Sequence, residues 1–255
     1  LTTGSHTLSV YAVDNAGNTG TPVTRTITVS LPAWTVMVYL VADNDLESAG
    51  VKDFQEMEQG IYNAVAAGNS GITNNVNIIV LFDRSGSYDT SDGNWSDTRL
   101  FRILPDNNFS ASASDRLDDG NTGKLHHIAN LGEKQMDDPA VLSWFLNYCK
   151  TEFPAQNYGL ILWNHGGGTR SVKSAARPTK AVCYDLTSNS QWYALLYTDE
   201  VQQALSANFS SGSKLGFIGF DACLMGMVET AYEYRNLAKY FIGSMNSEQG
   251  DGWDY

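Results

Sequence analysis

Cysteine, histidine and basic residues are all scarce in this sequence. It has three cysteines and four histidines in 255 residues. No two cysteines have the C-x-x-C spacing of a zinc site, so we expect no metal site, and their odd number leaves at least one thiol outside a disulfide. Lysine and arginine total 16 against 28 acidic residues, a formal net charge of −12. Such an acidic chain is not expected to bind nucleic acid, and it favours cationic substrates.

Long apolar runs are also missing. No hydrophobic segment reaches the ~20 residues that a membrane-spanning helix needs, so we expect no membrane span. Hydrophobic residues nevertheless make up 42% of the chain, which is typical of a globular protein. The length allows one sizeable domain and a smaller piece. Together with the acidic charge, these features favour an exported protein, secreted or held at a bacterial cell surface.

Residues 1–30 are predicted to form a module of their own. Two alternating apolar and polar segments, 6–13 and 24–29, flank the turn-forming residues 14–18. The pattern predicts a β-hairpin, and it is similar to the last hairpin of bacterial immunoglobulin-like β-sandwich domains. Because two strands are not stable alone, we expect the rest of that domain upstream. Residues 31–33 are the predicted linker.

From residue 34 onward, apolar runs alternate with helical patterns. Residues 34–42 and 76–82 are nearly continuous hydrophobic runs, typical of buried parallel strands. Residues 139–153 and 198–209 repeat apolar side chains at helical spacing. This alternation predicts an α/β fold with a mostly parallel sheet and flanking helices.

Two apolar runs end in reactive side chains. Cys223 closely follows the run 215–220, and His165 closely follows the run 158–163. Because reactive sites in α/β sheets lie at the carboxyl ends of the strands, we expect the two side chains to meet there. A helix predicted just after Cys223 favours the thiolate through its N-terminal amides. A thiol beside an imidazole predicts a cysteine nucleophile with a histidine base.

Four motifs in order resemble the clostripain-type cysteine peptidases, which share a fold with caspases, legumains and gingipains. They are the segments 34–47, 163–168, 220–225 and 250–255. The resemblance implies a caspase-like domain over residues 34–255, and a family fold that usually continues beyond the last motif. It also implies peptide hydrolysis with no required cofactor; the residues do not indicate whether calcium is needed.

The resemblance also implies roles for individual residues. Cys223 forms a thioester with the substrate, His165 transfers the protons, and the amides of Gly166 and Cys223 form the oxyanion hole. Asp221 lies in the S1 pocket and selects Arg or Lys at P1, since a carboxylate pairs with either cation. Met245 and Asn246 line the same pocket. The alternative for Asp221 is a carboxylate that accepts backbone amides of its own turn.

Residues 169–180 form a polar stretch with four basic residues directly after the histidine motif. We predict a surface loop open to proteolysis. An enzyme that cuts after Arg or Lys is expected to cleave itself here, with Lys180–Ala181 as the best bond. The two chains would stay joined through the shared sheet. The alternative is an uncut loop with solvated charges.

Three carboxylates follow the first predicted strand of the α/β region. Asn44 and Glu47 have the spacing of a helix capping box, which is the favoured interpretation. Asp43, Asp45 and Glu47 could instead bind a cation.

The remaining cysteines and histidines have no predicted catalytic role. We expect Cys149 and Cys183 to be buried packing residues. The adjacent His126 and His127 do not form a metal site, because neighbours in a helix or strand point in different directions. Two other functions stay open, namely a non-catalytic adhesion protein on a peptidase scaffold and a cysteine hydrolase acting on another amide.

Overall fold

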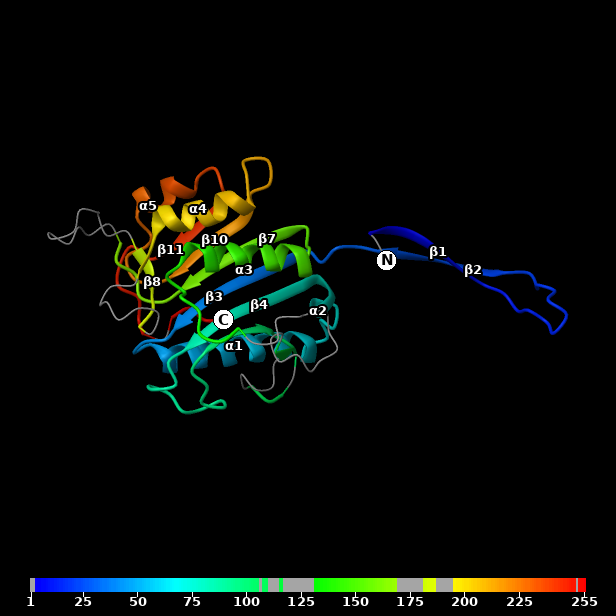
Figure 1. Ribbon diagram of the computed structural model, residues 1–255, viewed down its shortest axis with the longest axis horizontal. Coiled ribbons are helices and arrows are strands. Elements are labelled where there is room, and N and C mark those ends of the chain that lie inside the picture. The colour runs from blue at the N-terminus through cyan, green and yellow to red at the C-terminus, as the bar shows by residue number, and fades with distance from the viewer. Residues whose placement is uncertain are drawn as a thin grey trace.

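A seven-stranded sheet runs through the computed structural model (Figure 1). The structure describes residues 3–105, 107–109, 115–116, 131–168, 181–186, 195–250 and 252–255. Across the sheet, the strands follow the order β11 (Ala238–Gly243), β10 (Leu215–Asp221), β7 (Asn157–Trp163), β3 (Trp34–Ala42), β4 (Val76–Arg84), β5 (Thr98–Arg102) and β6 (Asp115–Arg116).

The five strands from β11 to β4 are parallel, and β5 and β6 add an antiparallel edge. Residues 37–42 of the central β3 are at most 1% exposed, as expected for a parallel strand covered on both faces. The predicted mostly parallel α/β sheet is therefore confirmed.

Helices cover both faces of the sheet (Figure 1). One face packs against α1 (Glu47–Ala66), and α2 (Ile72–Asn75) leads from α1 into β4. The other face packs against α3 (Pro139–Glu152), α4 (Thr198–Asn208) and α5 (Val228–Tyr234). We call these the α1 side and the α3 side. Among the described residues, no helix combines the length and the apolar character that crossing a membrane requires.

Alternation along the strands decides which polar side chains reach which side. In β4, Leu81 belongs to the core on the α3 side, and Phe82 to the core on the α1 side. Because successive side chains in a strand point to opposite faces, Asp83 projects to the α3 side and Arg84 to the α1 side. The strand ends thus supply two separate sets of polar groups.

The predicted capping box at the start of α1 is wrong. The helix follows Leu46, which makes no side-chain cap. Asn44 Oδ1 does accept the amide of Leu46 at 2.9 Å, but its amide group donates to the carbonyl of Tyr184. Asn44 therefore links β3 to a distant strand, and Glu47 is occupied elsewhere.

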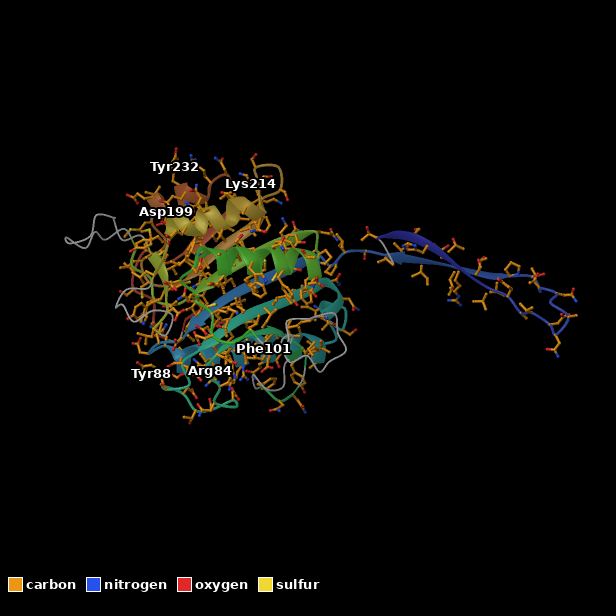
Figure 2. The ribbon with its side chains drawn as sticks, viewed as in Figure 1. Arg84, Tyr88, Phe101, Asp199, Lys214 and Tyr232 are labelled. Atoms are coloured by element: carbon orange, nitrogen blue, oxygen red, sulfur yellow. The ribbon has the colours of Figure 1, made fainter. Side chains whose placement is uncertain are left out.

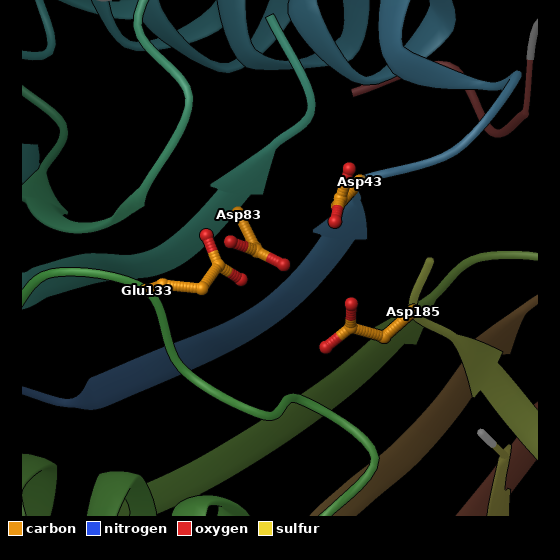
Figure 3. A group of neighbouring side chains, drawn as sticks. All are labelled: Asp43, Asp83, Glu133 and Asp185. Atoms are coloured by element: carbon orange, nitrogen blue, oxygen red, sulfur yellow. The ribbon is translucent and has the colours of Figure 1, made fainter. Parts of the chain in front are cut away.

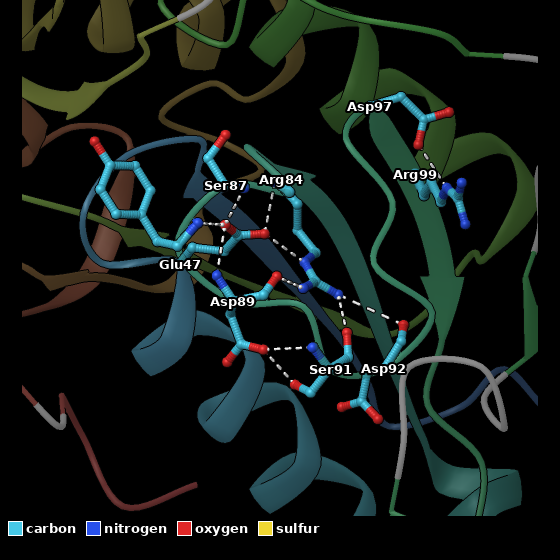
Figure 4. Close-up of polar contacts among 10 residues, drawn as sticks. Glu47, Arg84, Ser87, Asp89, Ser91, Asp92, Asp97 and Arg99 are labelled. Atoms are coloured by element: carbon cyan, nitrogen blue, oxygen red, sulfur yellow. Dashed lines mark hydrogen bonds and ion pairs between the residues drawn. The ribbon is translucent and has the colours of Figure 1, made fainter.

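Glu47 forms a buried ion pair with Arg84 at 2.9 Å (Figure 4), and both side chains are fully buried. The Glu47 carboxylate also accepts the backbone amides of residues 86–89. Arg84 donates to the carbonyls of Asp89 and Ser91 and stacks over the ring of Trp95. The pair therefore fixes the polar loop after β4 onto the start of α1.

The N-terminal residues form an antiparallel hairpin of β1 (Gly4–Val10) and β2 (Val23–Val29) that extends away from the sheet (Figures 1 and 2). Its side chains are exposed, including those of Leu8, Val10 and Ile27. The hairpin is as predicted, and its membership of an immunoglobulin-like domain stays a prediction.

A second hairpin, β8 (Ala181–Tyr184) and β9 (Leu195–Tyr197), lies beside the C-terminal ends of the central strands. Gly166 forms an isolated bridge with Val182, and the amide of Leu186 donates to the carbonyl of Asp43 at 3.1 Å. These contacts bring the end of β8 next to the segments that follow β3 and β7.

Candidate active site

The ends of β7 and β10 bring the two predicted reactive residues to one pocket. The strands are parallel neighbours, and Asp221 pairs with Trp163 in their register. His165 and Cys223 each follow that pair by two residues, as predicted from the two apolar runs. One pocket is lined by Leu46, Trp163, Asn164, His165, Asp221, Ala222, Cys223, Glu248, Gln249, Gly250 and Gly252.

Cys223 differs from the other two cysteines in its surroundings. Cys149 and Cys183 are fully buried, and burial raises the pKa of both thiols well above the usual range. Cys223 is partly exposed, and its Sγ accepts the amide of Glu248 at 3.3 Å. The following residue, Leu224, has a φ of 62°, a left-handed conformation that is uncommon for a large side chain. Such strain often accompanies functional turns.

His165 contacts a carboxylate that the sequence did not suggest for it. Its Nε2 lies 2.9 Å from Oδ1 of Asp45, which follows the end of β3. An ionised carboxylate can only accept, so Nε2 carries the proton and Nδ1 is left as the basic nitrogen. Both side chains are solvent-accessible, at 44% and 65%. The contact therefore mainly fixes which ring nitrogen of His165 carries the proton, and it adds little to the stability of the fold.

Asn164 holds the backbone before His165 in place. Its side-chain amide donates to the carbonyls of Val41 and Tyr184, and its backbone amide donates to the carbonyl of Asp221 at 3.2 Å. These bonds tie β7 to β3, β8 and β10 at one point. Asn164 is only 3% exposed, so the network is shielded from water.

Gly166 lies against the backbone of the cysteine turn. A Cβ at this position would lie 2.2 Å from the carbonyl oxygen of Cys223 and 3.0 Å from the Cβ of Ala222. No side chain fits at those separations, so only glycine allows the two loops to approach this closely. The next amide, that of Gly167, donates to the carbonyl of Ala181 at 3.0 Å.

The inner end of the pocket is acidic. The Asp221 carboxylate is 4% exposed, and its Oδ2 accepts the amide of Trp253 and the hydroxyl of Tyr255, each at 3.0 Å. Burial raises its pKa, and these two donors oppose the rise. Asp221 therefore lines the pocket and also accepts a backbone amide, although from residue 253 and not from its own turn.

Two further carboxylates lie near Asp221. Asp53 of α1 accepts the indole N–H of Trp163 at 2.6 Å, and burial raises its pKa to about 8, with a further rise from the charge of Asp221. Glu248 accepts the indole N–H of Trp253 at 2.9 Å, and burial raises its pKa as well. Asp221 and Glu248, which both line the pocket, thus supply carboxylates that favour a cationic group.

The remaining predicted site residues lie elsewhere or outside the described part. Met245 and Asn246 are exposed and are not among the residues that line this pocket; the carbonyl of Asn246 instead accepts the amide of Leu224 at 3.0 Å. Lys180 and the stretch 169–180 lie outside the described residues. Ala181 begins β8 and is 3% exposed.

Three residues of this site were missed by sequence reasoning. Asp45 was assigned to capping or cation binding, and Asp53 and Glu248 had no assignment. Asp45 lies three residues beyond the end of β3 and His165 two residues beyond the end of β7, and this position just past a strand end could have indicated Asp45. Asp53 lies within a helix, and only the packing of α1 on the sheet brings it near Asp221.

Comparison with known proteins gives consistent matches. The Clostripain family profile matches residues 38–255. Clostripain of Hathewaya histolytica is 36% identical over 208 residues, which cover 79% of this chain and 36% of that protein. The chain therefore spans about a third of that curated relative.

Two solved structures share the fold. A secreted C11 cysteine protease from Bacteroides thetaiotaomicron, in complex with an irreversible peptide inhibitor, has a TM-score of 0.63 and 26% identity, over 88% of this chain and 51% of that one. An inactive zymogen C11 protease from Parabacteroides distasonis has a TM-score of 0.57 and 23% identity, over 90% of this chain and 53% of that one. The chain spans about half of each structure. On the family match across residues 38–255, this chain belongs to the clostripain family of cysteine peptidases.

Proposed function

We propose that this chain carries the catalytic centre of a cysteine endopeptidase that cleaves after Arg or Lys. The observation that carries the proposal is the single pocket lined by His165, Cys223 and the buried Asp221. In this proposal, the pocket holds a nucleophile, a base and a carboxylate that pairs with a cationic side chain of the substrate. Family membership supports it, because the relatives are cysteine proteases.

In the proposed mechanism, His165 takes the proton of the Cys223 thiol, and the resulting thiolate attacks the scissile carbonyl carbon. The C–N bond then breaks, and a thioester forms as His165 protonates the leaving amine. Water next attacks the thioester carbonyl while His165 takes a proton from it. The C–S bond breaks, the carboxylic acid product leaves, and the thiolate is restored. The contact of Asp45 with Nε2 supports Nδ1 as the nitrogen that carries the moving proton.

The amides of Gly166 and Cys223 are the proposed oxyanion hole. The close approach of Gly166 to the Cys223 backbone supports this role, because it brings the backbones of the two residues together. Losing one such donor typically costs about 3 kcal/mol of transition-state stabilisation.

Asp221 is the proposed P1 selector, with Met245 and Asn246 as further S1 residues by family resemblance. A guanidinium or ammonium in the pocket would lower the raised pKa of Asp221 and keep its carboxylate ionised. The carboxylate of Glu248, which also lines the pocket, would add to the attraction for a cation. An acidic or aliphatic P1 side chain would leave this charge uncompensated.

We further propose that the enzyme is secreted and cleaves itself after Lys180. A relative described as secreted supports the first part. The second is supported by the basic character of residues 169–180 and by the position of Ala181, whose carbonyl binds Gly167 of the histidine loop. A cut there would free the start of β8 beside the pocket.

Cleavage of a peptide library that varies P1 tests the proposal. We expect the wild type to cut after Arg and Lys, and Asp221→Asn to lose most of that preference. His165→Ala and Cys223→Ala should lose about a thousandfold or more in kcat. Cys149→Ala, which removes a buried thiol outside the site, should stay active.

Turnover within tenfold of wild type in either His165→Ala or Cys223→Ala would refute the mechanism. Equal cleavage after Arg and Leu by the wild type would refute the proposed specificity. N-terminal sequencing tests the processing. We expect a fragment beginning at Ala181 from the wild type and none from Cys223→Ala. A fully active wild type that remains one chain would contradict it. Failure of an Arg-ending peptide electrophile to label Cys223 would favour a non-catalytic binding protein.

A further inference from the structure

Asp221 and Glu248 bring two carboxyl groups together in the pocket, and both residues line it. Trp253 connects them, because its backbone amide donates to Asp221 Oδ2 at 3.0 Å and its indole N–H donates to Glu248 Oε1 at 2.9 Å. The two carboxyl groups also form a hydrogen bond with each other. We call Asp221 and Glu248 the carboxyl pair.

A hydrogen bond within the carboxyl pair requires a proton. An ionised carboxylate only accepts hydrogen bonds, so one member of the pair must be protonated and must donate to the other. Asp221 Oδ2 already accepts the amide of Trp253 and the hydroxyl of Tyr255. Glu248 Oε2 is buried and accepts no donor from the described residues. The hydrogen bonds therefore make Asp221 the ionised acceptor and Glu248 the protonated donor.

The burial of the carboxyl pair favours the same state. Asp221 is 4% exposed and Glu248 is half-buried. Two ionised carboxylates in contact would repel each other strongly at such a place. Burial raises the pKa of both groups, and the hydrogen bond to Asp221 raises that of Glu248 further. Because the two groups interact directly, the proton belongs to the pair as a whole.

The groups packed around the carboxyl pair do not neutralise it. On the α1 side, burial raises the pKa of Asp53 to about 8, and the pKa of the Tyr255 hydroxyl is raised well above its usual range. Within the described part of the chain, neither member of the pair forms an ion pair with a lysine or an arginine. Asp53 and Tyr255 are therefore uncharged at neutral pH, and no fixed cation occupies the pair.

The catalytic residues border the carboxyl pair on its other side. Cys223 Sγ accepts the backbone amide of Glu248 at 3.3 Å, and His165 lines the same pocket. A side chain that enters the pocket next to the nucleophile thus meets the pair. The positive charge missing from the surroundings of the pair would then come from the substrate.

We propose that Glu248 is a second P1-selecting residue, and that the carboxyl pair holds one proton which a cationic P1 side chain displaces. The proposal rests on the proposed function, because it assumes that the pocket receives P1. When Arg or Lys binds, the O–H bond of Glu248 breaks and the proton passes to water. The pair becomes doubly ionised, and the guanidinium or ammonium donates to both carboxylates.

The proton makes recognition of a cation depend on pH. Where the carboxyl pair is protonated, a cation must displace the proton, so its affinity falls by up to about tenfold for each unit that the pH is lowered. Above that range the proton is already lost, and affinity no longer changes with pH. An uncharged P1 side chain displaces no proton and gains nothing from the second carboxylate.

Calorimetry of the full chain tests this displacement. Cys223→Ala, which prevents turnover, would be titrated with N-acetylarginine methylamide between pH 4.5 and 8, in two buffers of different ionisation enthalpy. The difference in observed enthalpy between the buffers counts the protons released. We expect release to approach one proton per ligand at the acidic end and to vanish at the upper end. The uncharged citrulline analogue of the same size should release none.

The outcomes separate this inference from the proposed function. Binding of the arginine ligand without proton release would overturn the displacement and leave the cleavage after Arg or Lys standing. Failure of the arginine ligand to bind at every pH would overturn both. Equal binding of the arginine and citrulline ligands would overturn both as well.

Variants of the same Cys223→Ala protein assign the proton. Glu248→Gln donates to Asp221 through its amide but cannot ionise, so it should release no proton. It should also bind the arginine ligand at least about tenfold more weakly at pH 8, since one charged contact is lost. Asp53→Asn is the matched control, because Asp53 is a nearby carboxyl group that does not line the pocket, and it should keep the release. Release that persists in Glu248→Gln would come from another group, such as His165, and would overturn the assignment.

Infrared difference spectra provide a readout that needs no variant of the carboxyl pair. A protonated carboxyl group has a carbonyl band that an ionised carboxylate lacks. At mildly acidic pH, the arginine ligand should remove such a band from the spectrum of Cys223→Ala, and the citrulline analogue should leave it. A band that the arginine ligand does not change would overturn the proposal, even if Glu248→Gln fails to fold.

Discussion

Asp45 and His165 are joined across the ends of two neighbouring parallel strands, with Oδ1 of Asp45 2.9 Å from Nε2 of His165. The two residues are 120 positions apart in the sequence. The contact makes Nε2 the donor and leaves Nδ1 to accept a proton. Asp45 is therefore a positioning residue, since its proposed effect acts through the imidazole.

Asp45→Asn should lower kcat by about 1.4- to 5-fold without changing KM or Tm. Asparagine can still accept from Nε2, but it cannot stabilise the imidazolium, and an exposed pair of this kind is worth only about 0.2–1 kcal/mol. Steady-state kinetics and thermal unfolding measure these effects. Glu229→Gln, which removes a carboxylate exposed on α5, is the control and should match wild type. A rise in KM with kcat unchanged would contradict the assigned role.

Gly166→Ala should abolish most activity and lower Tm. The new methyl group would lie 2.2 Å from the carbonyl oxygen of Cys223, so the histidine and cysteine loops must separate. Gly212→Ala is a suitable control, because nothing lies within 4 Å of its added Cβ. Equal activities for both variants would show that the close approach is not required.

Asp53→Asn should stabilise the protein more at pH 8.5 than at pH 5. The folded-state pKa of about 8 lies above the unfolded value of about 3.9, so the folded protein retains a proton that the unfolded chain releases. The free energy of unfolding therefore falls as pH rises from about 4 to 8, and asparagine removes that loss. We expect the gain to grow by more than about 1.4 kcal/mol between the two conditions.

Denaturant unfolding at both pH values checks this prediction. Asp89→Asn is a control of opposite sign, because the hydrogen bonds from Ser91 lower the pKa of Asp89. Its ionised form stabilises the fold above the unfolded pKa, so the variant should be less stable than wild type at both pH values. A pH-independent effect of Asp53→Asn would mean that Asp53 does not titrate as described.

Glu47→Gln should lower the free energy of unfolding by about 3–5 kcal/mol, since it leaves the buried Arg84 charge unpaired. Glu56→Gln breaks the surface pair with Lys52 on the same helix and should cost less than about 0.5 kcal/mol. Chemical denaturation of both variants gives the comparison. Similar costs for the two would show that burial does not set the strength of the Glu47 pair.

The sequence predicted the sheet and the two strand ends well, because their signals are local. A continuous apolar run predicts a buried strand, and a reactive residue just beyond it predicts a position at the sheet edge. His165 and Cys223 were placed in this way, and the structure brings them to one pocket. Cys149 and Cys183 were also predicted correctly as buried residues.

The partners of the carboxylates could not be predicted, because they depend on contacts between distant segments. The sequence treated Asp43, Asp45 and Glu47 as one capping or cation-binding group. The structure separates them: Asp43 lies beside Asp83 and Asp185 (Figure 3), Asp45 contacts His165, and Glu47 pairs with Arg84. The direction in which each of these side chains points depends on the twist and packing of the chain after β3. Local sequence patterns do not indicate that packing.

The order of the strands also affects when the site can exist during synthesis. β7 lies between β3 and β10 in the sheet. β3 can therefore pair with β7 only after the middle of the chain has been made, and β7 can pair with β10 only later still. Such non-local parallel pairing makes folding slow. The thiol and the imidazole therefore cannot meet on a ribosome-bound chain that has not yet emerged past Cys223. The strand order itself therefore delays formation of the pocket until β10 and the residues just after it have been made.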